Sequence, residues 1–177
     1  GISINDVKYI SFYEKPLIKF ERILQTFVET YPFSFAPFWR GIPDWVTNKL
    51  TIKSTIRNKL GYKGKILFIP HHEAHAVSAF YPSPFNKAAI FTVDGVGEWK
   101  SVGLYFGNDS DIIPLKEIRF PNSLGLLYST FTAFLGFKVN EDEWKVMGLA
   151  AYGKPRYYHK FMKIVEINED GSFSLNM

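Results

Sequence analysis

Hydrophobic and polar positions follow two different periods along the first third of the chain. Residues 8–13 are β-branched and aromatic between polar neighbours, which predicts a strand. Pro16 opens a segment whose apolar residues recur at helical spacing, and one face of the predicted helix should be buried: Leu17, Phe20, Ile23, Leu24, Phe27 and Val28. Because a residue before proline disfavours the helical region, this helix should end before Tyr31–Pro32.

Residues 31–65 carry a less regular pattern. The first part is expected to be broken by Pro32, Pro37, Gly41 and Pro43. The second part sets one acid, Asp44, against a run of basic residues interleaved with Trp39 and Trp45: Arg40, Lys49, Lys53, Arg57, Lys59, Lys63 and Lys65. Such a mixture can contact nucleic acid or an anionic surface. We favour a helix with Ile52, Ile56 and Leu60 inward and the lysines in solvent, because charge runs are usually solvated faces.

The pattern is sharper from residue 65 onward. The apolar run 66–69 predicts a buried strand ended by Pro70, and residues 71–80 predict a helix. Residues 88–93, 101–106 and 112–120 predict three strands, the first two joined by a turn over 94–97. Asn122 or Ser123 should cap a helix that ends at Gly136, with a shared face of apolar residues: Leu124, Leu127, Tyr128, Phe131 and Leu135. This order predicts an α/β fold with a three-stranded antiparallel unit.

Composition narrows the function class. With 46% hydrophobic and 18% aromatic residues in 177, the chain is not disordered, and without cysteine it has no disulfide, thiolate catalysis or cysteine-bound zinc. A net charge of +4 is too small by itself to indicate nucleic acid. No apolar run or leader segment is visible, so we expect a cytoplasmic protein that does not bind membrane. The missing initiator Met and a strand-like end at 172–176 suggest a piece of a longer protein.

Three of the four histidines lie within residues 71–75. His71 and His75 are four residues apart, so on a helix both imidazoles lie on one face and can bind one metal ion. The pair opens a helix after a buried strand, where sites in α/β proteins gather. The zincin motif HExxH is excluded, because neither His71 nor His72 is followed by the required residues.

A second candidate site is the turn Asp94-Gly95-Val96-Gly97-Glu98. A strand that ends in aspartate before two glycines directs a carboxylate into a cleft and exposes backbone N–H groups to phosphate. Phosphate-binding hairpins of this kind occur in the actin, sugar-kinase and Hsp70 superfold. The plain alternative is a good turn and nothing more.

The third candidate is residues 141–155, an acidic cluster followed by a glycine-punctuated segment that contains Lys145 and Gly148. Backbone packed as closely as glycine allows commonly lies against a ligand. The alternative is a helix whose first turn is rich in acids, followed by a loop. A Ser-His-Asp arrangement or GxSxG motif is not seen.

Together these segments resemble the carbamoyltransferases of the nodulation (NodU) and antibiotic-tailoring type. The resemblance rests on four motifs in order between Phe12 and Pro155: FYEKPLIKFERIL, HHEAHAVSAF, VDGVGEW and EDEWKVMGLAAYGKP. His71-x-Glu73-x-His75 is also similar to the HxEGH metal motif of the universal tRNA threonylcarbamoyl transferase. One departure is Asp142, where such proteins usually carry glycine, which bears on the local turn and any ligand contact there.

The resemblance implies an actin/Hsp70/sugar-kinase-like (ASKHA, ribonuclease H-like) domain, here the central part of an N-terminal metal- and nucleotide-binding domain over 1–177. Its metal, iron first with zinc or manganese as alternatives, would be bound by His71, His75 and Asp94, with a further aspartate beyond Met177. Asp94 is our catalytic candidate. The nucleotide, ATP or a carbamoyl-adenylate, would contact Gly95, Gly97, Glu98, Lys145 and Gly148.

In that family, carbamoyl phosphate and ATP give the carbamoyl-adenylate in a C-terminal YrdC-like domain, which is absent from this chain together with the first phosphate-binding hairpin. Carbamoyl then moves to the hydroxyl of a small molecule, with a general base from a segment nearer the N-terminus. The fragment would therefore need the remainder of its own polypeptide for activity. The alternatives are a tRNA threonylcarbamoyl transferase-like protein, an ASKHA-fold phosphoryl transferase and a non-catalytic nucleotide-binding module.

Overall fold

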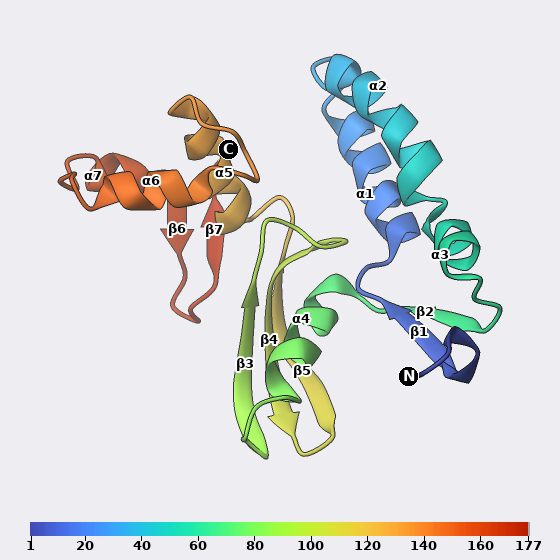
Figure 1. The fold of residues 1–177 in the computed structure, drawn as a ribbon. Coiled ribbons are helices and arrows are strands. Elements are labelled where there is room, and N and C mark those ends of the chain that lie inside the picture. Colours follow the sequence, from blue (N-terminus) through green and yellow to red (C-terminus); the bar gives the residue numbers. More distant parts are fainter. Residues whose placement is uncertain (177) are drawn as a thin grey trace. The chain divides into compact units, whose positions relative to one another are not determined.

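The computed structural model describes residues 1–176, and its chain forms two units (Figure 1). The first unit is Gly1–His75 with the short turn Gly97–Trp99, and the second is Ala76–Val96 with the chain from Lys100 onward. Helix α4, His71–Phe80, begins in the first unit and ends in the second. Each unit is described by itself.

The first unit contains two parallel strands. After a 3₁₀ turn at Ile4–Asp6, β1 (Tyr9–Phe12) pairs with β2 (Lys65–Phe68) in a register that sets Phe12 beside Phe68. Helix α1 (Pro16–Glu29) follows β1, and α4 follows β2. The predicted strands and both helices are confirmed as elements, and proline marks two of their boundaries: Pro16 begins α1 and Pro70 follows β2. The strand expected to be buried is only partly so, because Ile66 is buried whereas Leu67 is 39% exposed. Because β1 and β2 are parallel, their carboxyl ends meet at one edge.

The buried face predicted for α1 is only partly correct. Phe20, Ile23 and Phe27 are half-buried, and the Phe27 ring stacks on Phe38 with the ring centroids 4.1 Å apart. Leu17, Leu24 and Val28, however, are 73%, 39% and 71% exposed. Helical spacing tells which residues share a face, but burial needs a second element: Phe38 of α2 covers Phe27, and the Trp45 ring lies 5.7 Å from that of Phe20.

The expected break at Pro32 is confirmed, because residues 30–34 form a turn, but those at Pro37, Gly41 and Pro43 are wrong, because residues 35–49 are helical. Helix α2 runs from Phe35 to Asp44, a π-helical turn follows at Trp45–Lys49, and α3 covers Ile52–Leu60. Figure 1 shows α2 beside α1. Pro37 is tolerated because it lies in the first turn, where its missing N–H would have no helical acceptor. Pro43 lies inside α2 and is followed by the π-turn, which is a usual accommodation of a disrupted ladder.

Helix α3 matches the favoured prediction for the basic run. Ile52 and Ile56 are half-buried, whereas Leu60 is 50% exposed, contrary to expectation, because it lies in the last turn before Gly61. The basic residues of this helix, Lys53, Arg57 and Lys59, are exposed. They form a solvated face.

The second unit is built on a three-stranded antiparallel sheet, β3–β4–β5, as predicted. Its strands are Lys87–Val93, Lys100–Asn108 and Asp111–Arg119. The last residues of α4 cover this sheet (Figure 1): Ala76 and Phe80 form a core with Ile90 and Tyr105. Gly107 permits that packing, since a Cβ there would lie 2.6 Å from the Phe80 ring.

Helix α5 (Leu124–Phe134) follows the sheet and has the predicted ends. Ser123 is the N-cap, and its side chain accepts a hydrogen bond from Leu126 N at 3.0 Å. Gly136 has a φ of +83°, the left-handed conformation that favours glycine after a helix.

The last third continues with α6 (Glu143–Ala150), α7 (Tyr158–Phe161) and a hairpin of β6 (Val165–Ile167) with β7 (Phe173–Leu175). The strand-like end is confirmed. Closely packed backbone at 143–150 is not found, because this segment is a helix with acids before it, and a Cβ on Gly148 would meet nothing within 4 Å. The alternative that we gave for this segment is the correct one over those residues.

The mixed α/β class is confirmed, and the ASKHA assignment stays a prediction. Among residues 1–176, no helix has the length and apolar character needed to cross a membrane.

Candidate metal centre

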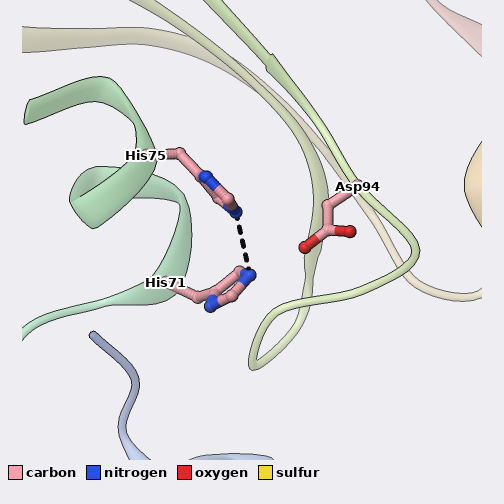
Figure 2. Close-up of side chains that lie close together, drawn as sticks. All are labelled: His71, His75 and Asp94. Atoms are coloured by element: carbon pink, nitrogen blue, oxygen red, sulfur yellow. Dashed lines mark hydrogen bonds between the residues drawn. The ribbon is translucent and has the colours of Figure 1, made fainter. Parts of the chain in front are cut away.

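Helix α4 places the two histidines one turn apart. Ala74 N donates to Pro70 O at 2.9 Å, so helical hydrogen bonding starts at Pro70 and His71 is the first residue of the helix. The Nε2 atoms of His71 and His75 face each other 3.0 Å apart (Figure 2). The expectation that both rings share one helix face is confirmed.

Asp94 follows the last residue of β3 and completes the cluster. One ligand atom from each of His71, His75 and Asp94 lies within 4.8 Å of the others (Figure 2). The Asp94 main chain donates to Ser101 O at 3.0 Å, and its carboxylate Oδ1 accepts from Gly95 N at 2.7 Å. These two bonds hold the residue at the strand end and orient its carboxylate.

This arrangement fits a metal ion. Imidazole nitrogen binds zinc at about 2.0–2.1 Å, so two such ligands lie about 2.8 Å apart at a right angle and about 3.4 Å apart at a tetrahedral angle. The observed separation of the Nε2 atoms is 3.0 Å. Two imidazoles and one carboxylate are a donor set suited to iron, zinc or manganese. The three residues expected to bind the metal are thus brought together in a way that suits one.

Glu98 lies in the first unit and is 8% exposed. Its Oε1 accepts from Lys15 N at 2.7 Å, and its two carboxylate oxygens lie 3.2 and 3.1 Å from His71 N. Its carbonyl oxygen accepts from Arg22 Nε at 2.6 Å. Burial lowers the pKa of the Arg22 guanidinium, and the Glu98 carboxylate acts in the opposite direction. The nucleotide contact expected for Glu98 stays a prediction.

The two glycines of the turn differ in their surroundings. A Cβ on Gly97 would lie 2.9 Å from His71 Cβ and 3.2 Å from His72 Cδ2. Close packing is therefore a sufficient reason for glycine at this position. A Cβ on Gly95 would meet only Leu126 Cδ2, at 3.6 Å. Their phosphate-binding role stays a prediction.

Lys145 and Gly148 are both on α6. Lys145 pairs with Asp142 at 2.7 Å, and Asp142 also accepts from Lys138 N at 3.1 Å. The hydrogen bond from Lys145, then that from Lys138, lowers the pKa of the Asp142 carboxyl. Asp142, where relatives of the expected type have glycine, has a φ of −114°, while the left-handed residue nearby is Asn140 at +65°. The turn thus forms without glycine at 142.

Sequence reasoning missed several residues around the site. The Tyr13 ring centroid is 5.8 Å from that of His71. Ser123 is fully buried, and its hydroxyl is within hydrogen-bonding reach of the carbonyl oxygens of Asp94 and Gly95. Gly125 lies against the Asp94 backbone. Two of them had a sequence signal: Ser123 as a candidate helix cap, and Gly125 as a glycine inside an otherwise helical run.

Comparison with known proteins identifies the family of this chain. Residues 1–177 match the family model described as "Carbamoyltransferase N-terminus". The chain is 45% identical over its whole length to the uncharacterized protein sll1178 of Synechocystis, and 31% identical over 99% of its length to the nodulation protein NolNO of Sinorhizobium fredii. It is 40% identical over 60% of its length to the nodulation protein NolO of Bradyrhizobium diazoefficiens.

The chain spans 30%, 25% and 20% of the lengths of these three relatives. Since the family model covers every residue, the chain belongs to the carbamoyltransferase N-terminal family.

Proposed function

We propose that the full-length protein moves a carbamoyl group from a carbamoyl-adenylate, made from carbamoyl phosphate and ATP, to the hydroxyl of a small molecule. Family membership supports carbamoyl transfer. The observation that carries the metal-assisted part is the 3.0 Å separation of the His71 and His75 Nε2 atoms beside the Asp94 carboxylate.

The reaction requires one bond to form and one to break. The acceptor oxygen attacks the carbamoyl carbon, and the bond from that carbon to the phosphate oxygen of the adenylate breaks, releasing AMP. The hydroxyl proton passes to a general base. Negative charge therefore develops on the leaving phosphate, and stabilising that charge is the task of the site.

His71, His75 and Asp94 would bind the metal, preferably iron, with zinc or manganese as alternatives. When bound, the ion supplies Lewis-acid stabilisation of the phosphate charge and a template for the reactants. Asp94 is held for this role by Gly95 N and by the main-chain bond to Ser101. Gly97, in the turn between β3 and β4, would offer its backbone N–H group to the phosphate, and Gly95 would do so when its N–H group leaves Asp94 Oδ1.

Other parts of the reaction fall to residues beyond this chain. The resemblance implies a fourth metal ligand after Met177, a base nearer the N-terminus and a YrdC-like domain that makes the adenylate. The partners of these 177 residues are therefore the rest of the same polypeptide, carbamoyl phosphate, ATP and the acceptor. The acceptor class is a hydroxyl compound such as a sugar, an aminoglycoside, a nodulation oligosaccharide or a macrocycle.

The test uses the full-length protein with carbon-labelled carbamoyl phosphate, ATP and a panel of such hydroxyl compounds. We expect label in one acceptor, formed only with ATP and accompanied by AMP, and no labelled product from Asp94→Asn. Lys138→Ala is the control, because it removes an exposed charge whose partner is Glu141. Phosphorylated acceptor with ADP would instead identify a phosphoryl transferase, and labelled tRNA a threonylcarbamoyl transferase-like protein.

A further inference from the structure

We propose that Glu98 is a positioning residue that fixes the first turn of α4, and with it His71, in the geometry that metal binding needs. This inference rests on the metal centre of the proposed function. It assigns Glu98 a role that the nucleotide contact expected from the sequence did not include. All contacts that carry it lie within the first unit.

Helix α4 begins without a side-chain cap of its own. Its N-cap position is occupied by Pro70, because Ala74 N bonds to Pro70 O. Serine, threonine, aspartate or asparagine usually fills this position and accepts from the first exposed N–H groups. Proline has no side-chain acceptor, so the first helical N–H, on His71, needs one from elsewhere. Glu98 supplies it from 27 residues away, at 3.1 and 3.2 Å.

The same carboxylate also lies at the start of α1. Lys15 is the N-cap residue of α1 and its N–H donates to Glu98 Oε1 at 2.7 Å. Helices α1 and α4 follow the parallel strands β1 and β2, so one carboxylate takes an N–H from the start of each. Helix N-termini carry partial positive charge, which stabilises a carboxylate placed there. Glu98 is only 8% exposed, so its charge is costly to bury, and the two N–H groups and helix N-termini compensate that cost.

The main chain around Glu98 is fixed as well. Arg22 Nε donates to the Glu98 carbonyl at 2.6 Å, from the second turn of α1. The preceding residue, Gly97, packs so closely on His71 that a Cβ would come within 2.9 Å of the His71 Cβ. The turn therefore contacts His71 in two ways. The Glu98 carboxylate accepts from the His71 N–H, and the Gly97 backbone packs against the His71 side chain.

Fixing this turn has a consequence for the metal. His71 is the first residue of α4, where helices fray when their N–H groups have no acceptor. His75 lies one turn further in, so loss of the cap would disturb His71 before His75. The 3.0 Å spacing of their Nε2 atoms would then no longer be held. Groups that orient metal ligands typically change metal affinity by about 10–100-fold when they are removed.

The experiment measures Zn²⁺ affinity of the full-length protein by competition with a chromophoric chelator, for wild type, Glu98→Ala and Glu98→Gln. Glu14→Ala is the matched control: Glu14 is a carboxylate of the same unit, 5% exposed, whose partner is Lys19 at 2.7 Å. Visible spectra with Co²⁺ report the ligand geometry, and circular dichroism confirms the fold of each variant.

We expect Glu98→Ala to bind Zn²⁺ about 10–100-fold more weakly and to alter the Co²⁺ spectrum, while Glu14→Ala does neither. Glu98→Gln should restore part of the affinity, because one amide oxygen can still accept from a backbone N–H. If Glu98→Ala does not fold, Glu98→Gln decides by the same spectrum. Wild-type affinity and spectrum in a folded Glu98 variant would overturn this inference alone. A wild-type protein that binds neither Zn²⁺ nor Co²⁺ would overturn the metal centre and this inference together.

Discussion

Gly125 lies against the backbone of Asp94: a Cβ at position 125 would come within 2.7 Å of the Asp94 carbonyl oxygen. The first turn of α5 thus rests directly on the residue that supplies the carboxylate of the candidate metal centre. Ser123, the N-cap of this helix, also reaches the Asp94 and Gly95 carbonyl oxygens. Asp94 is therefore placed by the start of α5 as well as by its own strand.

Gly125→Ala should destabilise the protein, because the new methyl group meets backbone atoms that cannot move aside as a side chain can. Overpacking of this kind typically costs about 1–3 kcal/mol. The measurement is the free energy of unfolding from urea denaturation. Gly148→Ala is the matched control, also a helical glycine but with nothing within 4 Å of its Cβ. It should be stabilised by about 0.5–1 kcal/mol, since alanine favours helix over glycine. Equal stability of the two variants would contradict the close approach.

The pair Lys100–Glu117 should make stability depend on pH. The Lys100 ammonium lies 2.9 Å from Glu117 and Arg119 Nε 2.5 Å from it. Burial acts to raise the pKa of Glu117, but the hydrogen bonds from Lys100 and Arg119 outweigh it and the pKa lies below its ordinary value. A depressed carboxyl pKa stabilises the fold above the unfolded value, about 4.3, and that stability is lost as the pH falls through the folded pKa.

Glu117→Gln should accordingly lower the free energy of unfolding by about 0.5–1 kcal/mol at pH 7 and by less at pH 3, because a partly exposed pair contributes little. Urea denaturation at the two pH values measures both numbers. Glu169→Gln, on an exposed residue, controls for the loss of a negative charge. An identical difference between wild type and Glu117→Gln at both pH values would refute the ion-pair explanation.

A comparison of Lys145 and Lys138 variants can distinguish a nucleotide contact from an ordinary surface ion pair. Each lysine pairs with an acid three residues away, Asp142 at 2.7 Å and Glu141 at 2.6 Å, but only Lys145 was expected to contact the nucleotide. Lys145→Ala should lower the rate of carbamoyl transfer from the adenylate about tenfold, the loss of one charge-assisted hydrogen bond. Lys138→Ala should leave this rate unchanged. Equal transfer rates for both variants would remove Lys145 from the site.

The sequence predicted those elements whose ends are set by local chemistry. Helix 71–80 was predicted with its observed limits, because Pro70 precedes it and its alanines favour a helix. Helix α5 was predicted for similar reasons, through Ser123 and Gly136. The helical segment at 35–49 was missed because proline was taken to break a helix, whereas Pro37 falls where it costs nothing and the π-turn accommodates Pro43.

Only those features of the site that lie within one segment of the sequence could be predicted. His71 and His75 share a helix face by spacing alone, and Asp94 was identified as the end of a strand. The role of Glu98 could not be predicted, because its carboxylate accepts from the N–H groups of Lys15 and His71, which are 83 and 27 residues away along the chain. These contacts depend on how α1 and α4 begin. The exposure of Leu17 and Val28 was equally out of reach, since a periodic pattern does not say which face finds a partner.

The most direct test of the central claim is elemental analysis of the purified full-length protein beside His71→Ala/His75→Ala, each with and without ATP. The account predicts close to one equivalent of iron, or of zinc or manganese, in the wild-type protein and none in the double variant. Wild-type protein that holds no metal under either condition, or a folded double variant that retains it, would contradict the proposed metal centre.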